Sequence, residues 1–138
     1  MTNIKDLADK LIKIGEDEKS NFSFQINPIP GEVEVLQILI EDREELPIFI
    51  SLSLEQILCI SYIFKENEIK ENLLPQLHES MLIANTPMPL SAFAKIDDQY
   101  VIYGAMSINS SIDDIIHEIE TLSDNTIDAI ETMSDYLK

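Results

Sequence analysis

The chain has 138 residues, 45% of them hydrophobic, and its 26 acidic and 9 basic residues give a formal net charge of −17. Acidic disordered tails lack such a share of Ile and Leu, so we expect a single folded domain over residues 1–138. That length is enough to bury a core without disulfides or a metal. Phosphate recognition needs clustered Lys and Arg, and Arg43 is the only arginine, so direct binding to nucleic acid is not expected.

The first residues and the apolar runs together predict a cytoplasmic protein. Residues 1–6 mix charges early and contain no signal-peptide core, and the longest apolar stretches are too short to span a membrane. The single cysteine, Cys59, excludes an intramolecular disulfide and lies in the apolar run Ile57–Ile60. No basic residue is near it in sequence to favour the thiolate, so we expect a buried, unreactive thiol.

The first half of the chain predicts one helix followed by four strands. Thr2 or Asn3 caps the helix, and Gly15 ends it. Apolar patterns then predict strands over residues 21–26, 33–40, 47–52 and 57–64. The Pro- and Gly-containing segment Asn27–Gly31 ends the first strand, and the continuously apolar end of the second predicts cover on both of its faces. Short polar turns join the last three strands into an antiparallel meander, which the first strand can extend.

The second half predicts two helices on either side of a hairpin. Apolar residues at helical spacing between Leu73 and Leu82, with Pro75 in the first turn, predict a helix that residues 85–89 end. Strands over residues 91–96 and 100–106 flank the turn 97–99. Ser111, with Asp114 three residues later, caps a last helix that runs to the end of the chain. The resulting order, α-β-β-β-β-α-β-β-α, predicts an α+β fold: an antiparallel sheet with packed helices.

The last predicted helix is amphipathic, with an apolar face that includes Ile112, Ile119 and Ile130. Its opposite face collects Asp113, Asp114, Glu118, Glu120, Asp124, Asp128, Glu131 and Asp135. Acids in the final turns oppose the partial negative charge of a helix C-terminus. A solvated face that keeps the protein soluble accounts for this charge. The functional alternative is a docking strip for a basic partner surface, formed by Glu120, Asp124, Glu131 and Asp135.

The same patterns predict which apolar side chains form the core. The predicted core residues are Leu7, Leu11, Phe24, Val35, Ile38, Phe49, Ile57, Ile60, Leu77, Met81, Phe93, Val101, Ile116, Ile119 and Ile130.

Motifs that carry chemistry are missing from the sequence, so no cofactor, metal or catalytic residue is predicted. Three glycines, at positions 15, 31 and 104, cannot build a phosphate loop or a dinucleotide fingerprint, and no Gly-x-Ser-x-Gly elbow is present. Gly104 lies within a strand pattern and indicates a bulge or a close backbone approach. His117, with Asp114 three residues before it, is the best candidate metal ligand, but a di-metal site needs a second such motif. We therefore expect His78 and His117 to be solvated.

Two segments carry a resemblance to a known family. Residues 46–58, LPIFISLSLEQIL, and residues 103–114, YGAMSINSSIDD, are similar to the YjfI-like family of small bacterial proteins of unknown function, as is the acidic segment 118–125. The resemblance runs from about Val33 to the C-terminus and brings no active-site motif. It implies a bacterial cytoplasmic protein, sometimes encoded beside a phage-shock-protein-A-like membrane-stress protein. The element order also resembles the sandwich of type III secretion chaperones, which is an analogy of fold alone.

These observations favour a non-enzymatic, cytoplasmic protein-binding module, adaptor or chaperone-like, for a partner with a basic or helical surface. A homodimer is compatible with the sequence. One alternative is an acidic mimic of nucleic acid, which would need carboxylates at backbone-like spacing across one surface. The other is a metal-dependent enzyme that uses scattered carboxylates and His117.

Overall fold

A computed structural model describes residues 3–18 and 20–138 and confirms the predicted α+β fold and element order. The helices and strands are α1 (Ile4–Glu16), β1 (Phe24–Ile29), β2 (Val35–Ile40), β3 (Ile48–Leu52), β4 (Gln56–Lys65), α2 (Leu74–Asn85), β5 (Ala92–Ile96), β6 (Gln99–Ser107) and α3 (Ile112–Thr132). Among the described residues, no helix is both long and apolar enough to cross a membrane.

The six strands form one antiparallel sheet in the order β1-β2-β3-β4-β6-β5. β1 to β4 make the predicted meander, and the β5–β6 hairpin joins it through β6, which pairs with β4. This central pair is long, from Gln56 opposite Ser107 to Lys65 opposite Gln99, with an irregularity in register between Tyr62 and Phe64. The β4–β6 pair therefore holds the two parts of the sheet together.

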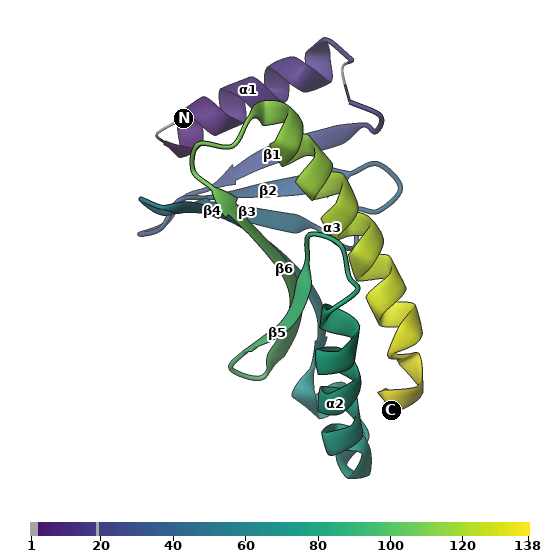
Figure 1. Ribbon diagram of the computed structural model, residues 1–138. Coiled ribbons are helices and arrows are strands. Elements are labelled where there is room, and N and C mark those ends of the chain that lie inside the picture. The colour runs from purple at the N-terminus through teal and green to yellow at the C-terminus, as the bar shows by residue number, and fades with distance from the viewer. Residues whose placement is uncertain (1–2, 19) are drawn as a thin grey trace.

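One face of the sheet is covered by helices, and the other, which we call the open face, is not. α1 packs on β1 and β2, α3 on β4 and β6, and α2 on β5. In Figure 1, α1 lies above β1 and α3 runs diagonally past the sheet until its C-terminal end comes down beside α2. On the covered face the strand side chains are almost fully buried, including Leu36, Ile38, Ile48, Ile50, Ile57 and Cys59.

The open face corrects part of the predicted core. Val35, Phe49 and Ile60 were expected inside, but they point to the open face and are only half-buried. The expected cover on both sides of β2 is also wrong. Successive side chains of a strand point to opposite faces of the sheet, so consecutive apolar residues make both faces apolar. The sequence then does not tell which of the two faces a helix covers.

The other core predictions divide into two groups. Phe24, Ile116 and Ile130 are half-buried. The fully buried ones are Leu7, Leu11, Ile38, Ile57, Leu77, Met81, Phe93, Val101 and Ile119.

Of the two predicted caps of α1, Asn3 is the one described: its side chain accepts a hydrogen bond of 2.9 Å from the Asp6 backbone N–H, whereas Thr2 lies outside the described residues. The ends of α1 and β1 differ from their predictions. α1 passes through Gly15 to Glu16, and the left-handed conformation that ends helices is adopted by Glu18 instead, with φ of 53°. β1 continues through Pro28 to Ile29, which is tolerated because β1 is an edge strand.

The last helix is shorter than predicted. α3 ends at Thr132, and residues Ser134–Tyr136 form a single 3₁₀ turn. The chain then turns back: the Lys70 N–H donates to the carbonyl of Tyr136, and the Lys138 N–H donates to that of Glu68, both at 2.9 Å. These bonds pair the C-terminal residues with the segment before α2, so tertiary contact ends the helix rather than any helix-breaking residue.

Candidate functional site

The predicted docking strip lies on α3 and on the turn that follows it. Ser111 begins α3, its Oγ accepting a hydrogen bond of 3.1 Å from the Asp114 N–H. Asp124 and Glu131 are exposed on the helix and Glu120 is half-exposed, but Asp135 belongs to the 3₁₀ turn beyond it. The strip is therefore a run of carboxylates on one side of the molecule and not a single helical face.

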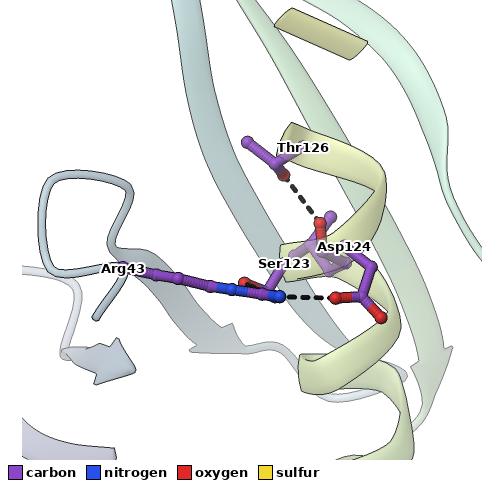
Figure 2. Close-up of polar contacts among 5 residues, drawn as sticks. Arg43, Ser123, Asp124 and Thr126 are labelled. Atoms are coloured by element: carbon purple, nitrogen blue, oxygen red, sulfur yellow. Dashed lines mark hydrogen bonds and ion pairs between the residues drawn. The ribbon is translucent and has the colours of Figure 1, made fainter. Parts of the chain in front are cut away.

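Asp124 already has a cationic partner within the chain. The turn between β2 and β3 brings Arg43 onto α3, where its Nη1 donates to Asp124 Oδ1 at 2.7 Å and to Ser123 Oγ at 3.0 Å (Figure 2). The side chains of Arg43 and Asp124 are 35% and 55% exposed, so their ion pair contributes less than about 1 kcal/mol to stability. Its main effect is to fix the turn against the helix and to neutralise one carboxylate of the strip.

Other strip carboxylates have no such partner. Among the described residues the two ion pairs are Arg43–Asp124 and Lys95–Glu66, so neither Glu120 nor Glu131 is paired. The last turn of α3 contains no basic residue. Its exposed acids form no ion pair among the described residues. The Lys70 Nζ lies nearby, where it donates to the backbone carbonyl of Asp135 at 3.1 Å.

Glu118 is not on the solvated face where the sequence placed it. The residue is 4% exposed, and its Oε1 is buried without a hydrogen-bond partner. The Glu118 carboxyl points at Gly104 of β6 and takes the space that a Cβ atom would fill there. The Leu90 carbonyl oxygen also lies close, 2.8 Å from that Cβ position. Of the two expectations for Gly104, a bulge or a close backbone approach, the structure shows a close approach: the missing side chain makes room for the Glu118 carboxyl group beside the Leu90 carbonyl.

Burial determines the protonation chemistry around Glu118. Removal from water raises the pKa of the Glu118 carboxyl, and the nearby charge of His117 lowers it in part. Cys59 lies opposite Gly104 in the sheet register, and burial together with the negative charge of Glu118 raises the pKa of its thiol to about 12. The prediction of a buried thiol is confirmed, and this pKa keeps the thiol protonated at neutral pH, so it is a poor nucleophile.

The two histidines lie apart from each other. His78 on α2 is exposed, and its Nε2 lies 2.6 Å from the Tyr100 hydroxyl of β6. His117 is exposed on α3. Across residues 3–18 and 20–138, no three His, Cys, Asp or Glu side chains come together as a group that could hold a metal ion.

Sequence reasoning missed two features of this region. The burial of Glu118 had a signal, because Glu118 follows Ile115 by three residues and precedes Leu122 by four, the spacing of the buried stripe. The contact of Arg43 with α3 had no signal in the sequence, because it joins residues that are 81 positions apart.

Comparison with known proteins identifies the group to which the chain is similar. Residues 1–137 match the family described as "Uncharacterized protein conserved in bacteria (DUF2170)". The "Uncharacterized protein YjfI" of Escherichia coli strain K12 is 30% identical over 113 residues, which cover 78% of this chain and 83% of the relative. The protein of the same description from Escherichia coli O157:H7 matches to the same extent.

Proposed function

We propose that this chain, which belongs to the bacterial DUF2170 family, is a non-enzymatic protein-binding module of the cytoplasm, an adaptor or chaperone-like protein. The resemblance to that family supplies no active-site motif that would favour an enzyme. Its partner carries a basic surface, which docks on the carboxylates of α3 and of the turn after it. A membrane-stress protein of the phage-shock-protein-A type is the first candidate, on the family resemblance alone.

The observation that carries the proposal is a group of exposed carboxylates without ion pairs at the C-terminal end of α3 and in the turn after it. Asp128, Glu131 and Asp135 are exposed, and no ion pair among the described residues involves them. Carboxylates in the last turn of a helix meet the partial negative charge of its C-terminus, so they do not serve the stability of the helix. A cationic partner would relieve both repulsions, and the same field would steer its approach.

Asp124 should be left intact in the test, because its replacement would also release Arg43. The docking variant therefore carries Asp128→Lys, Glu131→Lys and Asp135→Lys. A control of equal charge change carries Asp9→Lys, Glu16→Lys and Glu32→Lys, three exposed acids outside α3. Both variants differ from the wild type by six charges, so a general loss of negative charge affects them alike.

Each tagged protein is used to capture partners from a bacterial lysate at low and at high salt, and recovery is measured by quantitative mass spectrometry. The expected result is a protein with a basic surface whose recovery falls with salt and falls about tenfold or more in the docking variant, but not in the control. Equal recovery by all three proteins would show that the acids are only a solvated face. Recovery of nucleic-acid-binding proteins would instead favour mimicry of nucleic acid.

A further inference from the structure

The open face of the sheet is free of acidic residues in a chain that carries 26 of them. Its positions are the odd-numbered residues of β1, β2, β3 and β6, and the even-numbered residues of β5 and of β4 from Gln56 to Tyr62. Each is apolar, Ala, Ser, Asn, Gln or Tyr. The charged strand residues are Lys65, at the far end of β4, and Lys95, which reaches Glu66 and the Tyr100 ring. All acids thus lie on helices, turns and loops.

The centre of this face is apolar and slightly hollow. The rings of Phe49 and Tyr62, on neighbouring strands, lie 5.4 Å apart between centroids. Together with Ile29, Val35, Ser51 and Ile60 they line a hollow of about 260 Å³. No described residue covers these side chains, and Tyr62 remains 47% exposed. An exposed apolar surface of this kind is typical of an interaction site.

Charge decides which partner fits. Lys65 lies at the end of β4, and Glu41 and Glu44 lie at the rim of the face beside Gln25 and Leu39. The centre of the face offers neither a carboxylate to a basic partner nor a cation to an acidic one, so the centre is complementary to another uncharged apolar surface. A second copy of this chain supplies that surface. Two chains of net charge −17 repel each other wherever their acids meet, but the strands contribute no acid to a contact between two open faces. The centre of the interface then buries no charge.

Each edge strand of the sheet has one residue that hinders pairing with a further strand. β1 at one edge contains Pro28, which has no N–H to donate. At the other edge, the Asn85 side chain accepts a hydrogen bond of 2.7 Å from the Phe93 N–H of β5, and its Nδ2 lies 3.5 Å from the carbonyl of Phe93. Asn85 thus occupies the backbone groups of Phe93 that an added strand would use.

The size of the face is at the lower limit for a dimer. Six strands spaced about 4.8 Å apart and about 17 Å long give a projected area of roughly 400–500 Å². A pair of such faces buries roughly 800–1,000 Å², which at most reaches the lower limit for a specific interface.

We propose that the protein forms a two-fold symmetric dimer in which the open faces of two copies pack sheet on sheet, with Phe49 and Tyr62 at the centre. Face-to-face sheets of this kind lie about 10 Å apart with strands crossing at about −30°. The proposal is independent of the docking of a basic partner on α3, which lies on the opposite side of the sheet.

Sedimentation velocity of the full chain from about 1 to about 100 µM tests the dimer. The wild type should sediment as a dimer that tightens when salt screens the outer charges. Phe49→Glu places a carboxylate in the apolar centre and should raise the dissociation constant about 100-fold or more. Leu82→Glu is the matched control, since Leu82 is an apolar side chain of α2 that is 70% exposed on the helix side, and it should leave the dimer intact.

Circular dichroism checks that each variant is folded. If Phe49→Glu does not fold, Tyr62→Glu replaces it, because the Tyr62 side chain is already half in solvent. A wild type that stays monomeric at the highest concentration overturns the proposal and leaves the face to a different partner. A dimer that survives the substitution on the open face, or that Leu82→Glu also abolishes, overturns it as well.

Discussion

At the scale of single residues, the most informative group is the buried carboxyl of Glu118. It packs on Gly104, close to the thiol of Cys59, and its Oε1 has no hydrogen-bond partner. A buried polar atom in this condition costs free energy, since it has lost its water and gained nothing in return. Gly104 is required here for space and not for an unusual conformation, because its φ is not positive.

Replacement of Glu118 by Gln should stabilise the protein at neutral pH. Burial raises the pKa of Glu118, and an acid with a raised folded-state pKa destabilises the fold above that pKa. This cost disappears as the pH falls through the folded-state pKa toward the unfolded value. Urea unfolding should therefore show Glu118→Gln more stable than the wild type by on the order of 1 kcal/mol at about pH 7, with a smaller advantage at about pH 4.5.

Glu120→Gln is the control, because it is the same substitution two residues away, at a side chain that is half-exposed. It should change the midpoint little at either pH. Equal stability of the Glu118 variant and the wild type across this range would contradict a charged, unpartnered carboxyl at this position.

At the scale of elements, α3 holds the molecule together. Its inner stripe is buried against β4 and β6, Arg43 ties it to the β2–β3 turn, and Asn125 donates hydrogen bonds to the Pro89 carbonyl and to Ser91 Oγ before β5. Beyond it, the Tyr136 hydroxyl lies 2.7 Å from Ser80 Oγ of α2. One helix thus contacts both parts of the sheet and, through the turn that follows it, α2.

Truncation of the inner stripe should therefore be costly. Ile119 is 1% exposed, and Ile119→Ala should lower the free energy of unfolding by about 2–5 kcal/mol, through lost apolar burial and the cavity left behind. Ile12→Ala, the same exchange at a side chain of α1 that is 45% exposed, should cost much less. Chemical denaturation of both variants makes the comparison. Similar midpoints for the two would mean that the inner face of α3 is wrongly assigned.

At the scale of the whole molecule, charge and apolar surface are separated. The acids lie on helices and loops, and the strands carry none of them. The charged shell therefore repels itself around a sheet whose uncovered side is neutral. This distribution supports both proposals: attraction of a basic partner to α3, and contact between copies at the open face.

Salt should stabilise the folded chain. A compact chain of net charge −17 repels itself, and ions screen that repulsion with a Debye length that falls from about 30 Å at 0.01 M to about 8 Å at 0.15 M. The melting temperature of the wild type should rise over this interval. A melting temperature that is constant or falls would contradict a stability limited by self-repulsion. The Phe49→Glu variant, measured in parallel, separates screening within one chain from any contribution of the dimer.

The type and order of the elements and the buried state of Cys59 follow from the sequence, which also narrowed the first cap to Thr2 or Asn3 and Gly104 to a bulge or a close backbone approach. These depend on local periodicity, on capping chemistry and on residues with few alternatives. The folded molecule is needed to see which face of the sheet is covered, where α3 ends, that Glu118 is buried and that Asp124 is paired. Each of these depends on contacts between distant segments: a helix selects one of two apolar faces, the C-terminal residues pair with the segment before α2, and Arg43 reaches across 81 positions to Asp124.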